Sequence, residues 1–355
     1  MAALNDEQTM IRDMVREWAD NESPVSAFRK MRNAAPAAGY DAAAWATMAE
    51  MGLAGIVVPE EFGGTAFGYL SLGLVLEQLG RNLAASPLAS TAAAATAIVM
   101  GGTDAQKQSW LPRIASGEVV ATLAIDEGPV HDLTKIKTVV AGGKLTGTKA
   151  FVAEGDSAGL FVVAATDGLY LVAGDAAGVT RAHRQMADSR SHAQISFDGA
   201  AAEKIEGATV QAIVDRATAA VCAEMLGLAV QAFETTNDYL KTRVQFGQLL
   251  STFQALQHRM AKLFTEIELM RSAVEAALEA IDAGRSDVDQ AVTLAKAVAS
   301  DTLKLVSREM IQLHGGIGMT DDYDAGFYIK RAAVLEAMWG NAAFHRERFA
   351  RLNGY

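Results

Sequence analysis

Hydrophobic side chains recur at two different spacings along this 355-residue chain, and the spacing changes twice. In residues 1–117, and again in residues 206–355, apolar positions return every three or four residues, which is the repeat of helices with one buried face. Residues 118–205 instead contain short apolar runs separated by turns such as Gly142-Gly143 and Asp167-Gly168. The sequence therefore predicts an α+β fold with an N-terminal helical domain, a middle antiparallel β-domain and a C-terminal helical domain.

Local signals place individual elements within these regions. Residues 102–117 predict a short helix that Pro112 ends, because proline has no N–H to donate. The β-type runs are Val119–Ile125, Thr138–Ala141, Lys144–Val152, Leu160–Ala165, Gly168–Ala173 and Ala193–Phe197. Near the C-terminus, Ile213–Lys241 predicts one long helix, and apolar stripes in residues 260–274 and 287–313 predict two more. We expect these helices to form a four-helix bundle whose faces also serve an oligomer interface.

Composition and charge narrow the possible functions. The content of hydrophobic residues is 50%, which fills a core, and the net charge of −11 argues against a nucleic-acid surface or an anionic membrane as partner. Cys222 is the only cysteine, so neither an intramolecular disulfide nor a cysteine-based metal site is expected. The start of the chain reads as an amphipathic helix rather than a signal peptide, and no apolar run suggests a spanning helix. We expect a cytoplasmic protein.

Two short motifs carry groups suited to a dinucleotide. Arg243 is followed by Phe246-Gly247 and Gln254, and further along the chain comes Gln312–Gly318. Arginine presents a planar fork of donors to phosphate, glutamine amides donate and accept, and glycine lets the backbone approach a ligand closely. Each motif alone is also typical of an ordinary helix end, and His314 is expected to be a helix C-terminal residue rather than a proton carrier.

With these motifs, and with helices, a β-domain and a bundle in that order, the chain resembles the acyl-CoA dehydrogenase family over essentially its full length. The matching segments are Val58-Pro59-Glu60-Glu61-Phe62-Gly63-Gly64, Gln106-Lys107 with Trp110-Leu111-Pro112 and Gly117-Glu118, Arg243 with Phe246-Gly247 and Gln254, and Gln312-Leu313-His314-Gly315-Gly316-Ile317-Gly318. The resemblance implies FAD-dependent α,β-dehydrogenation of an acyl-CoA thioester, with an electron-transferring flavoprotein as electron acceptor. It also implies a carboxylate base that removes the α-proton of the thioester.

The positions at which the family carries that base hold other residues here. In the segment Met338-Trp339-Gly340, Trp339 occupies the usual glutamate position, and Ala217 occupies the alternative position on an earlier helix. Neither side chain can take a proton. Glu336 is the remaining candidate base. Asp215 points away from Ala217 on an ideal helix and is expected to be a surface charge.

Two further segments depart from the family, while the dinucleotide motifs do not. The family holds the isoalloxazine of a subunit's own FAD with a Thr-Glu-Pro-x-x-Gly-Ser-Asp loop and a Trp-Ile-Thr segment, and the chain has Ile125–Asp132 and Phe151-Val152-Ala153 there. The resemblance implies that a second set of positions reaches across a dimer interface to the adenosine diphosphate part of the neighbour's FAD. Those cofactor-binding candidates are Arg243, Phe246, Gln254, Gln312, Gly315 and Gly316.

This imbalance resembles a subclass of the family that works as heterotetramers on steroid or other bulky acyl-CoA esters. We hypothesise that the chain is the complementing subunit of a homologous catalytic subunit, which holds most of the FAD. Two alternatives stay open. One is a self-sufficient homo-oligomeric acyl-CoA dehydrogenase that uses Glu336 as base. The other is a non-catalytic scaffold that keeps the fold for assembly or acyl-CoA sequestration. Whatever the function, Trp339 is expected to pack the end of the bundle.

Overall fold

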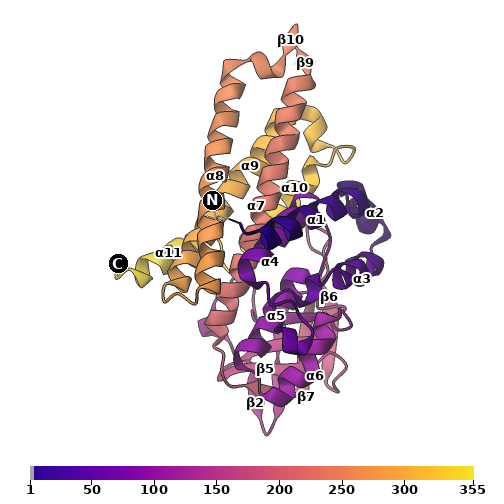
Figure 1. The fold of residues 1–355 in the computed structure, drawn as a ribbon, viewed down its shortest axis with the longest axis vertical. Helices are drawn as coiled ribbons and strands as arrows, with labels where there is room; N and C mark the ends of the chain where they lie inside the picture. The colour runs from indigo at the N-terminus through magenta and orange to yellow at the C-terminus, as the bar shows by residue number, and fades with distance from the viewer. Residues whose placement is uncertain (1–3) are drawn as a thin grey trace. The chain divides into compact units, whose positions relative to one another are not determined.

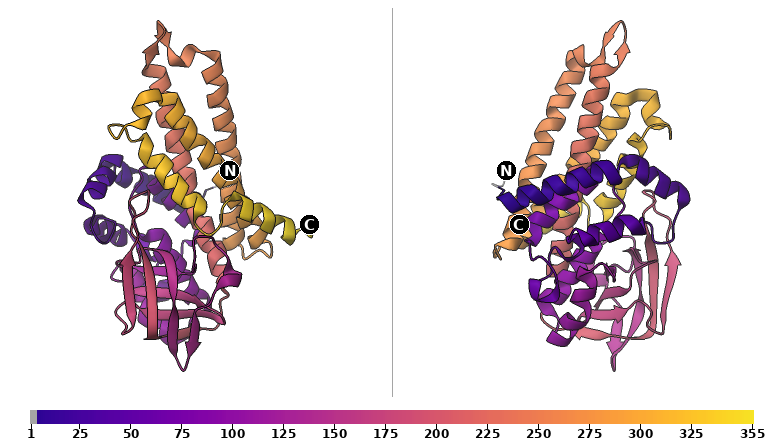
Figure 2. Two further views of the ribbon diagram at one scale, coloured as in Figure 1. Left: turned by 180° about the vertical axis from the view of Figure 1, so that it is seen from behind. Right: turned by 45° about the vertical axis from the view of Figure 1, so that its right-hand side comes forward.

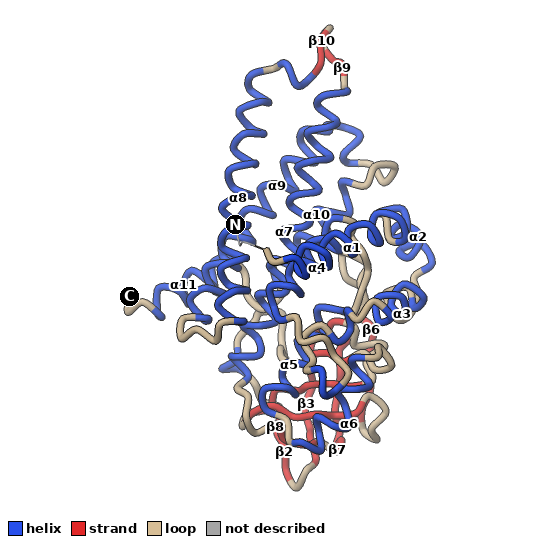
Figure 3. Tube along the Cα trace, in the orientation of Figure 1, coloured by secondary structure: helices blue, strands red, loops and turns tan. Residues whose placement is uncertain are grey.

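The computed structural model describes residues 4–355 and separates into two compact units, which we call the sheet unit and the bundle unit. The sheet unit comprises Phe28–Leu72 and Ala85–Ala220, and the bundle unit comprises Met1–Ala27, Gly73–Ala84 and Val221–Tyr355. Along the chain, helices precede and follow a block of strands, which confirms the predicted fold class (Figure 3). Within the described residues, no helix combines the length and the apolar content that crossing a bilayer requires.

Six α-helices precede the first strand. They are α1 (Asp6–Glu22), α2 (Val25–Ala34), α3 (Ala42–Glu50), α4 (Gly68–Arg81), α5 (Leu88–Gly101) and α6 (Asp104–Ala115). Thr103 and Gln106 form a capping box that starts α6. The prediction that Pro112 ends this helix is wrong, because the helix continues to Ala115. Proline removes only its own N–H, and its carbonyl still accepts a hydrogen bond from the Ser116 N–H at 3.0 Å.

Two four-stranded sheets make up the β-region of the sheet unit. Their strands are β1 (Ala121–Ala124), β2 (Val139–Ala141), β3 (Lys144–Ala153), β4 (Leu160–Ala165), β5 (Gly168–Ala173), β6 (Val179–His183), β7 (His192–Ala201) and β8 (Glu203–Ile205). The sheet orders are β1-β4-β5-β8 and β2-β3-β7-β6, and all pairs are antiparallel except β1 with β4. The predicted strands are present, but β6 and β8 were not predicted. The first is exposed without alternation, and the second has three residues.

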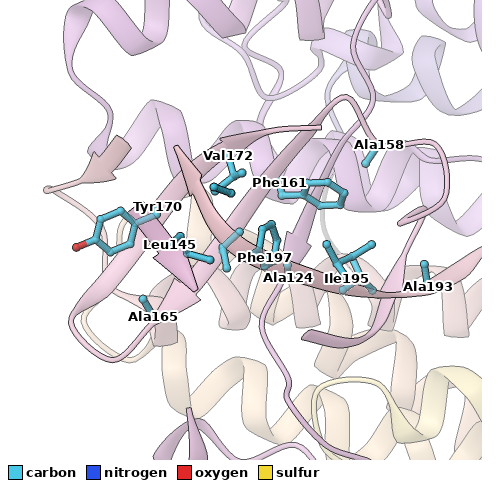
Figure 4. Close-up of a cluster of buried hydrophobic side chains, with 13 residues drawn as sticks. Ala124, Leu145, Ala158, Phe161, Ala165, Tyr170, Val172, Ala193, Ile195 and Phe197 are labelled. Carbon is cyan, nitrogen blue, oxygen red and sulfur yellow. The ribbon is translucent and has the colours of Figure 1, made fainter. Parts of the chain in front are cut away.

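The core of the sheet unit lies between these two sheets (Figure 4). Phe161 of β4 and Phe197 of β7 meet edge to face with their ring centroids 6.0 Å apart. Inward-facing residues of both sheets complete the cluster, as expected when two sheets pack face to face. They include Leu145, Val152, Val163, Tyr170, Val172 and Ile195.

Long helices build the bundle unit. They are α7 (Val210–Thr242, which enters the unit at Val221), α8 (Gln254–Asp282), α9 (Val288–His314), α10 (Ala325–Ala337) and α11 (Ala342–Leu352). A hairpin of β9 (Val244–Gln245) and β10 (Gln248–Leu249) joins α7 to α8, which run side by side (Figures 1 and 2). The helices predicted at Ile213–Lys241, 260–274 and 287–313 are confirmed as α7, α8 and α9.

Candidate functional site

The first dinucleotide motif lies on the hairpin at the end of α7. Arg243 follows the last helical residue and is exposed, while its backbone N–H donates to Tyr239 O at 2.9 Å. Phe246 and Gly247 form the two-residue turn, with φ of 53° and 78°, which is the backbone of a type I′ hairpin. A phenylalanine in this left-handed region is strained, and the side chain of Phe246 is 87% exposed. The hairpin therefore presents a strained aromatic side chain to solvent.

The rest of the first motif and the second motif reach the same end of the bundle. Gln254 of the first motif is the exposed first residue of α8, and Gln312 of the second motif is exposed in the last turn of α9. The ring of Tyr239 near the end of α7 lies 4.3 Å from the ring of His314 at the end of α9. Arg259 of α8 is ion-paired with Glu309 of α9 at 2.6 Å. These contacts bring the ends of α7, α8 and α9 together, so all six cofactor-binding candidates lie at one end of the bundle unit.

The two glycines after α9 differ in the reason why glycine is suited to each position. Gly315 has φ 64° and ψ −139°, a combination that essentially only glycine adopts. Gly316 has no positive φ, and a Cβ placed on it would meet nothing within 4 Å in this chain. Backbone geometry therefore explains Gly315, whereas the space over Gly316 is open to a group from outside the chain.

The segment that matches the family's base position is a tightly held turn. Helix α10 ends at Ala337, and Trp339 follows with φ 52°, half-buried. The Nζ of Lys296, fully buried on α9, lies 2.9 to 3.1 Å from four backbone carbonyls, which share its three protons. Two of them end α10, at Leu335 and Glu336, and two belong to the turn, at Met338 and Gly340. The His345 Nε2–H donates to the Trp339 carbonyl at 3.0 Å. The strained conformation of Trp339 thus persists because contacts on both sides fix it.

Sequence reasoning missed Lys296, which sits in an apolar stripe of α9 with nothing local to mark it. Burial lowers its pKa to about 8, against the opposing effects of Cys222 and Glu336. Burial also raises the pKa of the Cys222 thiol to about 12, so the thiol is neutral.

The carboxylates near the base positions are occupied by other contacts. Glu336 accepts a hydrogen bond from Lys304 Nζ at 3.0 Å, and its own backbone carbonyl is one of the acceptors of Lys296. Met338 to Asn341 contain no carboxylate. Ala217 is buried on α7, and the expectation that Asp215 is a surface charge is wrong. Asp215 is 4% exposed and accepts from Gln211 Nε2 at 3.0 Å, because both faces of this part of α7 are covered.

In the sheet unit, the two segments that match the family's flavin loops lie against each other. The N–H of Ala150 donates to the Asp126 carbonyl at 2.8 Å, and the buried Lys149 Nζ donates to Ile125 O at 2.9 Å. Lys149 Nζ also donates to the Glu127 carboxylate at 2.8 Å. Phe151 has φ 51° and a side chain that is 45% exposed.

Glu127 uses its carboxylate to close this loop on itself. Besides Lys149, its donors are the Lys137 N–H and both the N–H and hydroxyl of Thr138, at 2.7 to 2.9 Å. Burial alone would raise the pKa of Glu127, but the hydrogen bonds from Lys149, Thr138 and Lys137 lower it to about 2. The loop thus satisfies its charged groups internally.

Comparisons with known proteins give a consistent result. The chain matches the family described as "Acyl-CoA dehydrogenase, N-terminal domain" over residues 5–118 and "Acyl-CoA dehydrogenase, C-terminal domain" over residues 208–352. It is 31% identical to the acyl-CoA dehydrogenase IpdE2 of Mycobacterium tuberculosis, with 92% of this chain and 91% of that protein covered. It is 30% identical to IpdE2 of Mycolicibacterium smegmatis, with 98% of each covered. A solved structure of a Tcur3481-Tcur3483 steroid ACAD variant superposes with a TM-score of 0.93 at 31% identity, covering 98% of both chains.

Proposed function

Because this chain belongs to the acyl-CoA dehydrogenase family of oxidoreductases, we propose that it is the complementing subunit of a heteromeric acyl-CoA dehydrogenase. In this role the end of its bundle unit contacts the adenosine diphosphate part of an FAD seated mainly in a homologous subunit. That partner supplies the carboxylate base, and the heteromer is a heterotetramer. An electron-transferring flavoprotein takes the electrons.

The observation that carries this proposal is the outward direction of the six cofactor-binding candidates. Arg243, Gln254 and Gln312 are all exposed, and the space over Gly316 is open. A guanidinium and two amides beside an open glycine backbone fit the phosphates and sugar of a dinucleotide. Within this chain these groups make little use of their hydrogen-bonding capacity.

The sheet unit also supports these proposed roles of the two subunits in binding FAD. A subunit that binds its own isoalloxazine needs free donors in residues 125–132 and 151–153. Here the Glu127 carboxylate and the Lys149 ammonium neutralise each other, and the residue after Phe151 is an aliphatic Val152. The chain's own loops therefore lack the residue types with which the family holds the flavin ring, whereas the end of the bundle keeps those that contact a nucleotide.

The chemistry of the reaction places further demands that the partner meets. FAD, when bound, supplies a two-electron acceptor for the β-hydrogen of the thioester. Removing the α-proton requires a carboxylate, and the turn Met338-Trp339-Gly340 offers a thioether, an indole and backbone carbonyls already bound to Lys296 and His345. The name of the structural relative, a steroid ACAD, supports a bulky acyl-CoA ester as substrate.

The test uses the assembled complex with the homologous subunit. Arg243→Ala should weaken FAD binding by the complex about tenfold or more, since a charged hydrogen bond contributes about 1.5–3 kcal/mol. The control Arg351→Ala alters an exposed arginine on α11 that pairs with the nearby Glu347, and it should leave FAD affinity unchanged. FAD affinity is measured by titrating the flavin-free complex and following flavin fluorescence.

Two results would overturn the proposal. If the chain purified alone carries a full complement of FAD and dehydrogenates an acyl-CoA, with Glu336→Gln abolishing the activity, it is self-sufficient. If Arg243→Ala and Arg351→Ala leave the FAD affinity of the complex equally unaffected, the chain is a scaffold that does not contact the cofactor.

A further inference from the structure

The histidine that ends α9 is held at both of its ring nitrogens. His314 Nδ1 lies 2.7 Å from the Met310 carbonyl, and since a carbonyl only accepts, Nδ1 carries the proton. His314 Nε2 lies 2.9 Å from the Tyr323 hydroxyl. In the neutral ring Nε2 has no proton, so the hydroxyl donates to it. When the ring is neutral, these two contacts fix it as the tautomer with its proton on Nδ1.

The same histidine is linked to the backbone that leads into the glycine pair. The Tyr239 hydroxyl donates to the His314 carbonyl at 3.3 Å, while its ring lies 4.3 Å from the imidazole. That carbonyl belongs to the peptide group that joins His314 to Gly315. Beyond the pair, a Cβ on Gly318 would lie 3.0 Å from the His314 Cβ, so the following short helix Gly315–Met319 packs directly on this residue. Side chain and backbone of the histidine thus fix where Gly315 and Gly316 lie.

We propose that neutral His314 is a positioning residue, which holds the Gly315-Gly316 backbone in the geometry that contacts the partner-held dinucleotide and releases it on protonation. The proposal rests on the proposed function, because it concerns the same contact. It goes further in naming the group that sets the contact and the condition that weakens it. His314 itself touches no cofactor in this account.

Protonation of Nε2 would reverse its hydrogen bond with the Tyr323 hydroxyl, and burial disfavours the charge that the ring would then carry. Of the neighbouring elements, α7 contributes the Tyr239 phenol, and the segment before α10 contributes the Tyr323 phenol, on which the Asp324 carboxylate acts. Burial raises the pKa of Tyr323, so the phenol stays protonated as a donor.

The direction of the pH effect follows from burial. Burial lowers the pKa of His314 below its usual 6.5, although the hydrogen bond to Met310 opposes the change. A released, solvated histidine would bind a proton near its ordinary pKa, so the released form binds more protons than the held form. The held form is therefore fully favoured above about pH 6.5 and loses its advantage as pH falls below that value.

The experiment compares the FAD affinity of the assembled complex at about pH 7.5 and about pH 5.5. If His314 takes up a proton in the released form but not in the held form, FAD affinity should fall by up to about tenfold between these two pH values. In His314→Gln, the amide can donate to the Met310 carbonyl and accept from Tyr323, but it does not titrate. This variant should bind FAD like the wild type at the higher pH and lose less affinity at the lower pH. His258→Gln, which alters an exposed histidine on α8, should keep the wild-type ratio between the two pH values.

The outcomes separate this proposal from the proposed function. Arg243→Ala should weaken FAD binding at both pH values and leave their ratio unchanged. If it does, but His314→Gln shows the same ratio as the wild type, the positioning role of His314 is wrong and the proposed function stands. If Arg243→Ala changes nothing at either pH, both fall together. His314→Leu, which loses both hydrogen bonds, should weaken binding at the higher pH, and equal losses in the Leu and Gln variants would contradict the role.

Discussion

The loop of residues 125–138 in the sheet unit and the hairpin end of the bundle unit use their polar groups in opposite directions. In the loop, Glu127 accepts from Lys149, Lys137 and Thr138, all within the sheet unit. At the end of the bundle, Arg243 and the amides nearby are exposed. The first arrangement stabilises the chain itself, and the second is suited to contact with something outside it.

Within the bundle unit, the hairpin and the turn after α10 differ in how they carry backbone strain. Phe246 has a positive φ in a two-residue turn that is exposed on all sides, so strain there is not compensated by burial. Trp339 has a similar φ, but Lys296 and His345 hold the turn through its carbonyls. Strain of about 1–3 kcal/mol per residue persists where other contacts offset it or where function requires it. We therefore expect substitutions in the loop of residues 125–138, the inward region, to lower the stability of the chain. Substitutions at the hairpin end of the bundle unit, the outward region, should instead weaken its contacts in the complex.

The largest expected effect is in the inward region. Lys149→Met leaves the Glu127 carboxylate without its buried cation, and we expect the free energy of unfolding to fall by about 3–5 kcal/mol. Urea denaturation of the chain measures this change. Lys204→Met is the matched control, because that lysine forms a half-exposed pair with Asp167 and its loss should change stability far less. Equal losses in the two variants would contradict an inward-directed loop.

The second effect is the pH dependence of the same loop. The folded-state pKa of Glu127 is about 2, below its usual 4.5. Between these values the unfolded chain binds the extra proton, so the contribution of Glu127 is present above pH 4.5 and is lost as pH falls toward 2. Other carboxylates titrate in this window, so the diagnostic quantity is a difference. The slope of unfolding free energy against pH should be shallower in Glu127→Gln than in the wild type.

Periodicity in the sequence predicted most of the fold but not the contacts that define these regions. The stripes of α8 and α9 and the runs of β3, β4 and β5 were sufficient, because one buried face repeats along each element. β6 was missed because it is exposed almost throughout. The helix end was misplaced at Pro112 because the carbonyl of this proline still accepts a hydrogen bond from the Ser116 N–H.

The candidate site was predicted in part for a similar reason. Arg243 and the Gly315-Gly316 pair were found because a motif keeps its residue types close together in sequence. The partners of Lys149 and Lys296 come from distant segments, and a lysine in an apolar stripe gives no local sign of the carbonyls it will meet. The hydrogen bonds of Tyr239 and Tyr323 to His314 also join separate elements, so only the folded structure reveals them.

A smaller effect separates the two glycines in the outward region. Gly315→Ala forces a side chain into a backbone conformation that only glycine adopts, and should lower the free energy of unfolding by about 1–3 kcal/mol. Gly316→Ala meets open space and should change stability by less than about 0.5 kcal/mol. The added methyl group should nevertheless weaken FAD binding by the complex. If Gly316→Ala binds FAD like the wild type, the open space is not where the dinucleotide approaches.

The smallest effect on stability has the opposite sign. Phe246→Asn places Asn-Gly in the two-residue turn, the pair that this turn type prefers, and should stabilise the isolated chain by about 0.5–1 kcal/mol. The same change removes the exposed aromatic side chain and should reduce FAD affinity in the complex, because the strained Phe246 is kept for its contact with the cofactor at a cost in stability. Urea denaturation of the chain alone and FAD titration of the complex measure the two halves. If the isolated chain instead becomes less stable, the edge-to-face contact of Phe246 with Phe253, 6.2 Å between centroids, stabilises the hairpin internally, and the outward role of Phe246 fails.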